Sequence, residues 1–116
     1  DRDLASTRQA FDDFRILLTN YPESKYAAEA RTRMIAIKDK LARHELLVAD
    51  YYLRRGAFLA AANRGKYVVE FYRDSPLVEQ ALEIMVESYD KLGLDKLRSD
   101  TEQVLRLNFP QNRRFR

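Results

Sequence analysis

Apolar residues recur every three or four positions along this chain, and one stretch of the pattern is unusually long. Residues 25–55 contain neither proline nor glycine. Proline removes a backbone donor and glycine costs backbone entropy, so both residues tend to end helices. An unbroken period of three to four is typical of an amphipathic helix. The sequence therefore predicts one long helix over about residues 25–55, straight or bent, with an apolar stripe formed by Ala30, Met34, Ile37, Leu41, His44, Val48 and Tyr52.

Turn-forming residues divide the rest of the chain into shorter helical segments. We expect these helices at about residues 3–20, 57–73, 76–92 and 97–108. Pro22 disfavours continuation of the first helix, and Gly56 and Gly93 suit helix ends. Ser75 is expected to cap the helix that follows it, with Pro76 at its first position. The predicted fold class is all-α, with about five helices.

The chain also repeats itself. Tyr52-x-x-x-Gly56 returns 37 residues later as Tyr89-x-x-x-Gly93, a step close to the tetratricopeptide repeat of about 34 residues. A second repeat relates Leu17-x-x-x-Tyr21 to Val68-x-x-x-Tyr72, which lies 51 residues later. The longer spacing implies an insertion of about four helical turns in the second helix. We therefore predict a tetratricopeptide-like α-solenoid. It comprises a repeat domain over residues 1–110, with a partial repeat at 1–56, repeats at about 45–75 and 77–110, and a frayed basic tail at 111–116.

Several classes of function lack the residues that they need. There is no cysteine, so disulfides and thiolate metal sites are excluded, and no run of about 18 apolar residues suggests a membrane span. No phosphate-binding glycine loop and no catalytic or metal-ligating spacing occurs. We predict a protein that is not an enzyme and binds no cofactor and no metal. The lone His44 is interpreted as a packing residue, and the ladder of Glu79, Glu83 and Glu87 as solvated helix surface.

The net charge of +3 is unevenly distributed. Basic residues predominate in residues 31–73 and acidic residues in 74–112. The basic middle could face an acidic partner, or it could be the ordinary sorting of a solvated helical surface. Nucleic-acid binding is the weaker hypothesis, because the basic residues form no single short patch.

Arg64 is the cation that the helical wheel singles out. It lies about 90° from the centre of the apolar stripe of the third helix, near Ala60, Tyr67 and Phe71. Arginine and tyrosine commonly anchor interfaces, so this second face is a candidate binding site. Alternatively, it packs on the next repeat. Arg55 precedes Gly56 at a helix end, where the helix dipole alone would favour a cation.

Four segments of the chain resemble a known family, the BamD lipoproteins of outer-membrane assembly. The segments are Ala10–Phe14, Tyr21–Tyr26, Tyr51–Phe58 and Ala61–Arg64. The resemblance implies the C-terminal tetratricopeptide repeats of a periplasmic scaffold that holds BamA through its membrane-proximal POTRA domain. It also implies contacts with accessory lipoproteins. The distribution of charge, rather than the resemblance, leads us to predict no contact with nucleic acid.

The resemblance further implies which residues meet the partner. The family's arginines in the Arg-Gly-Ala-aromatic and Asn-Arg elements correspond to Arg55 and to Arg64, which follows Asn63. The expected partner-binding set comprises these residues and two aromatic neighbours of Arg64: Arg55, Asn63, Arg64, Tyr67 and Phe71. The expected location is the periplasmic face of the outer membrane, with any lipid anchor outside this fragment, which contains no signal peptide or lipid-attachment cysteine. The alternative function is a generic tetratricopeptide adaptor that binds a peptide in its groove.

Overall fold

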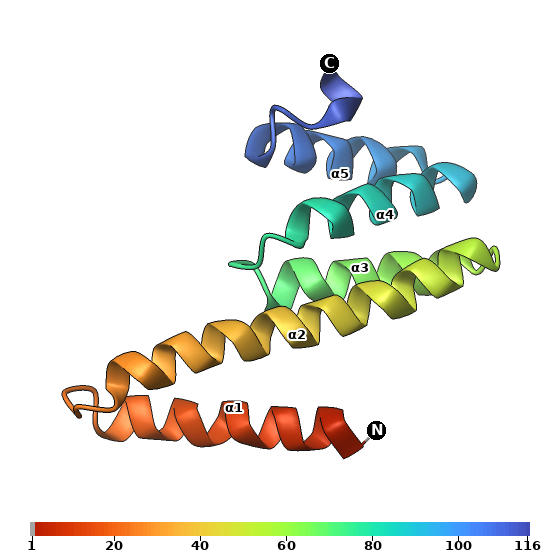
Figure 1. Ribbon diagram of the computed structural model, residues 1–116. Coiled ribbons are helices and arrows are strands. Elements are labelled where there is room, and N and C mark those ends of the chain that lie inside the picture. The colour runs from red at the N-terminus through yellow and green to blue at the C-terminus, as the bar shows by residue number, and fades with distance from the viewer. Residues whose placement is uncertain (1) are drawn as a thin grey trace. The chain divides into compact units, whose positions relative to one another are not determined.

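The computed structural model describes residues 2–116, in which α-helices are joined by tight turns (Figure 1). The elements are α1 (Arg2–Asn20), α2 (Ala27–Arg54), α3 (Phe58–Phe71), α4 (Val78–Lys91), α5 (Asp95–Asn108) and a short 3-10 helix, η1 (Arg113–Phe115). The 28 residues of α2 form one continuous helix, which confirms the predicted long helix. The all-α, tetratricopeptide-like prediction is also confirmed, because packed helix hairpins make up the described chain.

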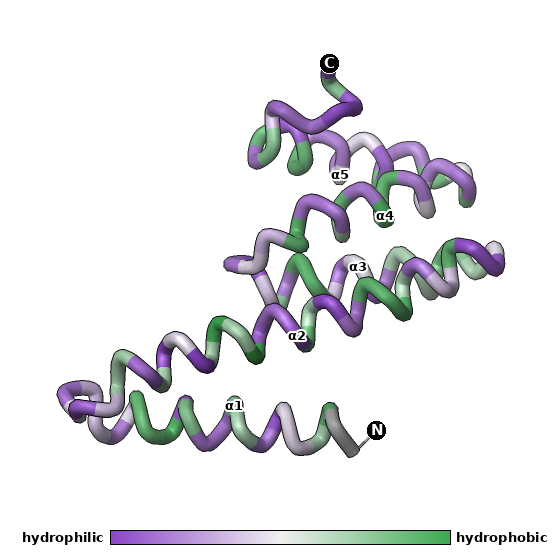
Figure 2. Tube along the Cα trace, viewed as in Figure 1, coloured by the Kyte–Doolittle hydropathy of each residue, from purple (hydrophilic) through white to green (hydrophobic). Residues whose placement is uncertain are grey.

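The helices are amphipathic, and their residues group into two compact units. Hydrophobic and hydrophilic positions alternate along each helix, as the colouring of Figure 2 shows. The N-terminal unit extends to Leu41, and the C-terminal unit spans Ala42–Arg116. The boundary therefore falls inside α2, so no loop separates the two units.

The N-terminal unit has a small core. It is formed by α1 and the first part of α2, and its buried residues are Ala27, Ala30 and Leu41. The ammonium of Lys38 lies 5.9 Å from the centre of the Phe11 ring, across the two helices. Most of the larger apolar side chains of the N-terminal unit, Phe11 among them, are only half-buried.

The C-terminal unit holds the larger core, and α4 lies at its centre between α3 and α5. Gly65 explains how α3 approaches α4 so closely. A Cβ atom at this position would lie 2.9 Å from the backbone oxygen of Ala81 and 3.0 Å from the Cγ of Met85. The close crossing of α3 and α4 therefore depends on glycine at this position, because a Cβ atom this near to the backbone of α4 requires a shift.

Two turns of the C-terminal unit, at Gly56 and Gly93, have the same hydrogen-bond pattern. Gly56 and Gly93 both adopt positive φ, at 78° and 70°. Their amides donate to Leu53 and Asp90, three residues back, over 3.1 Å in each case. Glycine is needed at both positions because side chains disfavour this conformation.

The turn before α4 corrects the expected start of that helix. The helix begins at Val78, and Pro76 lies in the preceding turn rather than at the first helical position. The Oγ of Ser75 accepts a hydrogen bond of 3.1 Å from the amide of Leu77, so Ser75 stabilises the turn instead of capping α4 directly. The turn before α2 is built in the same way, with the Oγ of Ser24 accepting from the amide of Tyr26 at 3.2 Å.

The C-terminal segment is ordered against α4, so the expectation of a frayed tail is wrong. Asn112 is 4% exposed, and its side-chain Nδ2 donates a hydrogen bond of 2.8 Å to Oε2 of Glu79. Its Oδ1 accepts from the amide of Arg114 at 3.0 Å, as the serine hydroxyls do in the two earlier turns. Arg113 pairs with Glu83 at 3.2 Å. Residues 109–112 therefore form another turn of the same type, and η1 follows it.

Candidate functional site

The site is built around an ion pair between α2 and α3. Nη1 of Arg64 donates to Oε2 of Glu45 over 2.8 Å. The side chain of Glu45 is 5% exposed, whereas that of Arg64 is 43% exposed. The pair therefore has one end in the core of the C-terminal unit and the other at its surface.

The environment of Arg64 strengthens its charged form. The hydrogen bond to Glu45 raises the pKa of Arg64 above its ordinary value, against a smaller opposing effect of burial. Tyr52 makes a weaker contribution that raises the pKa in the same direction. Arg64 therefore remains a cation, as arginine side chains do in proteins generally.

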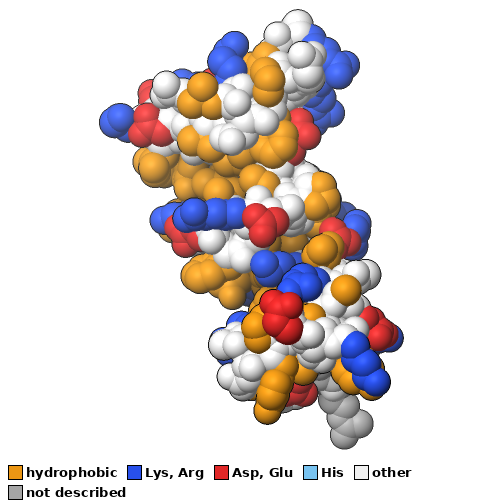
Figure 3. Space-filling view, turned by 90° about the vertical axis from the view of Figure 1, so that its left-hand side faces the viewer, with side chains coloured by type: hydrophobic (Ala, Val, Ile, Leu, Met, Phe, Trp, Pro, Cys, Tyr) orange, Lys and Arg blue, Asp and Glu red, His pale blue; other side chains and the backbone are white. Residues whose placement is uncertain are grey.

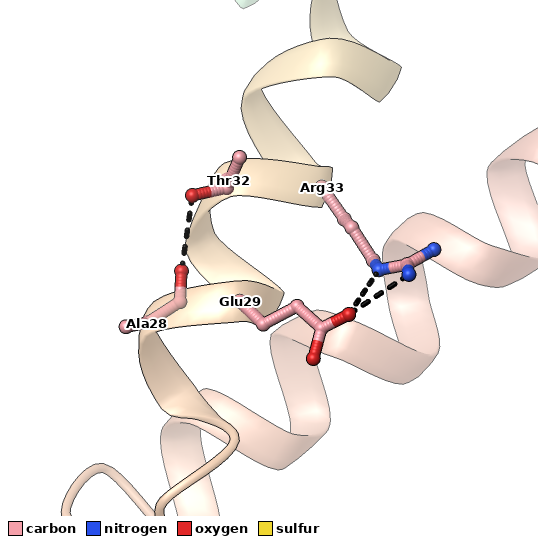
Figure 4. A network of polar contacts seen from close by, with 4 residues as sticks. All are labelled: Ala28, Glu29, Thr32 and Arg33. Atoms are coloured by element: carbon pink, nitrogen blue, oxygen red, sulfur yellow. Dashed lines mark hydrogen bonds and ion pairs between the residues drawn. The ribbon is translucent and has the colours of Figure 1, made fainter.

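An exposed ion pair of α2 shows what distinguishes the Glu45–Arg64 pair. Nη2 of Arg33 lies 2.8 Å from Oε1 of Glu29 one turn away, and both side chains are more than half exposed (Figure 4). Such exposed pairs contribute only about 0–1 kcal/mol to stability. Because the carboxylate of Glu45 is buried, removing Arg64 should cost more free energy than breaking the exposed pair.

The exposed part of Arg64 opens into a depression of about 540 Å³. Its lining comes from two helices: Glu45, Tyr52, Ala60, Asn63, Arg64 and Tyr67. Three of these, Asn63, Arg64 and Tyr67, belong to the predicted partner-binding set, and the structure brings them together. Hydrogen-bonding groups and aromatic rings thus surround a single cation.

An aromatic surface continues from the rim of the depression. The rings of Tyr67 and Phe71 are 4.5 Å apart and tilted by 37°. Phe71 is 61% exposed, and Tyr67 also packs against Tyr72 with a centroid separation of 5.9 Å. The structure therefore places Phe71 beside the depression through Tyr67.

Arg55 is placed elsewhere. Its guanidinium lies over the ring of Tyr51, 5.3 Å from the centroid, at the end of α2. It does not line the depression around Arg64. The two predicted arginines thus form separate surface features.

Comparison with known proteins places this geometry in a family. A family model described as "Outer membrane lipoprotein" (YfiO) matches residues 1–105, which is most of the chain and includes the whole site. The chain belongs to this family. The YfiO family match and the all-helical fold together confirm the resemblance drawn from the four sequence segments.

The curated relatives carry the BamD name. "Outer membrane protein assembly factor BamD" of Neisseria meningitidis serogroup A is 43% identical over 112 residues, covering 97% of this chain and 42% of the relative. The BamD of Vibrio cholerae is 44% identical over 108 residues, or 93% and 45% of the two chains. That of Haemophilus influenzae is 40% identical over 107 residues, or 92% and 41%. The chain thus spans less than half the length of these BamD relatives.

The residue that sequence reasoning missed is Glu45. It lies four residues after Leu41 and seven before Tyr52, so it is a carboxylate close to the apolar stripe of α2. A charged residue in such a position is the signal that could have found it, because buried carboxylates need partners. The identity of its partner, 19 residues further along, depends on how α2 and α3 pack.

The remaining polar residues that the sequence singled out lie outside the depression and contribute to packing or to contacts within this BamD-family chain. His44 is half-buried on α2. Glu79 and Glu83 are not simply solvated, because they hold Asn112 and Arg113 of the C-terminal segment. Within residues 2–116, no group of three metal-ligating side chains is close enough to hold an ion, and no helix is long and apolar enough to cross a membrane.

Proposed function

We propose that this chain is a non-catalytic scaffold of the machinery that assembles β-barrels in the outer membrane. It works at the periplasmic face of that membrane and binds the membrane-proximal POTRA domain of BamA. The assembly-factor names of its BamD relatives support the process, and the stacked helix hairpins support a scaffold. Such helical arrays present extended surfaces to protein partners.

One observation carries the assignment of the contact: a partly exposed guanidinium held at the mouth of a depression next to exposed aromatic rings. Arginine and tyrosine are enriched among the residues that dominate interface energetics. The planar fork of Arg64 can also grip a carboxylate with two parallel hydrogen bonds. We propose that an acidic group of the POTRA domain binds Arg64, while Asn63, Tyr67 and Phe71 surround the contact.

Arg55 is proposed as a secondary contact. It is exposed at the end of α2 and stacked on Tyr51, outside the depression. A contact there would lie at the periphery of the interface, where side chains contribute little. Arg55→Ala should therefore weaken binding less than Arg64→Ala.

The test is the affinity of the isolated POTRA domain for the intact protein and its variants, measured by calorimetry. Arg64→Ala should weaken binding at least about tenfold, which corresponds to about 1.4 kcal/mol. Lys66→Ala is the matched control, because Lys66 is exposed on the same helix and points about 160° away from Arg64 around the helix axis. It removes the same charge and should change the affinity less than about twofold.

The melting temperature of each variant separates binding from folding. Arg64→Glu is less suitable than Arg64→Ala, because it sets a second carboxylate beside buried Glu45 and should lower the melting temperature as well. A change from acid to base on the POTRA domain should restore part of the affinity that Arg64→Glu loses. If Arg64→Ala folds normally and binds as tightly as the parent, the proposed contact is wrong.

A further inference from the structure

Glu45 is the one charged side chain at this site that a partner cannot reach. Its side chain is 5% exposed and lines the depression from α2. A carboxylate in that position costs free energy through desolvation, and a residue that served packing alone would more often be apolar. Its contact with Arg64 suggests what the carboxylate does.

The contact leaves part of the guanidinium available. A guanidinium carries five N–H donors in a rigid plane, and the hydrogen bond of 2.8 Å to Glu45 uses Nη1. The side chain of Arg64 remains 43% exposed. An arginine held from the inside therefore presents donors toward the mouth of the depression in a fixed plane.

We infer that Glu45 is a positioning residue for the partner contact. Its buried carboxylate holds the guanidinium of Arg64 in the orientation that an acidic group of the partner recognises. This inference rests on the proposed binding through Arg64. A free arginine side chain loses rotamer entropy when it is immobilised in an interface, and an arginine that is already held loses less.

The charge of Glu45 has an effect of its own, which the test must remove. A carboxylate behind Arg64 repels the acidic group in front of it, so any variant that neutralises position 45 also removes this repulsion. Glu45→Gln and Glu45→Ala are therefore compared with each other. Both are neutral, but only glutamine keeps an oxygen that can accept the hydrogen bond from Arg64.

The experiment measures the affinity of the isolated membrane-proximal POTRA domain of BamA for the intact protein carrying these variants. We expect Glu45→Gln to bind about three- to tenfold more tightly than Glu45→Ala, the range expected from holding one long side chain in place. In the Arg64→Ala background, the two substitutions at position 45 should give equal affinities. A general structural role of Glu45 would preserve the difference when Arg64 is absent.

Each other outcome is decisive. Equal affinities of Glu45→Gln and Glu45→Ala with Arg64 present would overturn the positioning role, as would a difference that persists without Arg64. If Arg64→Ala alone leaves the affinity unchanged, the proposed contact through Arg64 is wrong, and the inference about Glu45 fails with it. If Arg64→Ala weakens binding and the two variants at position 45 do not differ, only the inference about Glu45 fails.

A measurement on the parent protein covers the case in which a variant at position 45 does not fold. Rotation about the Nε–Cζ bond of Arg64 can be followed by NMR of the guanidinium nitrogens in the unbound protein. We expect slow rotation for Arg64 and fast rotation for exposed Arg73, which serves as the reference. Fast rotation of the Arg64 guanidinium would overturn the inference.

Discussion

Two leucines of α2 occupy opposite environments. Leu41 is 5% exposed, and Leu47, less than two turns further along, is 67% exposed. Both lie in the same continuous helix, so they share its backbone conformation and intrinsic propensity. Any difference in the effect of truncating them must therefore come from packing.

Truncation of the buried leucine should be costly. Leu41→Ala is expected to lower the free energy of unfolding by about 2–5 kcal/mol, since it removes buried methyl groups and leaves a cavity. Leu47→Ala, the matched control, should change it by less than about 0.5 kcal/mol. Chemical denaturation of both variants measures the difference. Equal effects would mean that the stripe of α2 is not core.

Individual residues of the site differ in how well the sequence predicts their neighbours. Arg64, Tyr67 and Phe71 are spaced three and four residues apart on one helix, so helical geometry predicted that they share a surface, and the family resemblance added Asn63. The contact of Arg64 with Glu45 joins two helices. No local pattern fixes which residues of α2 face Arg64, and Glu45 was missed for that reason.

At the scale of elements, the helices could be predicted closely because their signals are local. The period of three to four and the placement of Gly56 and Gly93 gave boundaries within about two residues. The start of α4 was placed too early, because a turn with two hydrogen bonds to Ser75 precedes that helix. The C-terminal segment was misjudged because Asn112 is held by Glu79, 33 residues away.

The close packing of α3 on α4 depends on Gly65, which has no side chain. Gly65→Ala places a Cβ atom 2.9 Å from a backbone oxygen of α4, so the two helices must move apart. The gain in helix propensity of about 1 kcal/mol offsets part of the overpacking cost of about 1–3 kcal/mol. We expect a net loss of up to about 2 kcal/mol in the free energy of unfolding, measured with denaturant.

Lys66→Ala is the control for this variant as well, because it changes a neighbouring exposed residue of α3 and should be nearly neutral. A Gly65→Ala variant that is more stable than the parent would show that α3 and α4 can separate without cost. The close approach would then contribute little to the fold.

At the scale of the whole molecule, the two units differ in how much they bury. The C-terminal unit contains most of the buried side chains, among them Val68, Val86 and Leu105, whereas the N-terminal unit buries chiefly Ala27 and Ala30. Apolar burial supplies most of the free energy that resists local opening. Stability is therefore expected to be uneven along the chain.

Hydrogen exchange should reveal this difference. Backbone amides in the middle of α1 are expected to exchange at least about tenfold faster than those in the middle of α4. Both sets lie in regular helices, so the comparison isolates the effect of packing. Equal protection of α1 and α4 would show that the two units open together despite their different cores.

The ion pair of Glu45 and Arg64 also affects how this surface can evolve. An arginine that met only a partner's acid could exchange its charge with that partner through two substitutions, one on each protein. Here a second carboxylate, that of Glu45, lies 2.8 Å behind the guanidinium and is only 5% exposed. Reversing the charge at position 64 would then set like charges together inside the fold unless position 45 changed as well. For the proposed contact, the route to a charge-swapped pair therefore passes through intermediates that are impaired in binding, in folding or in both, and this epistasis should make the proposed contact slow to change in evolution.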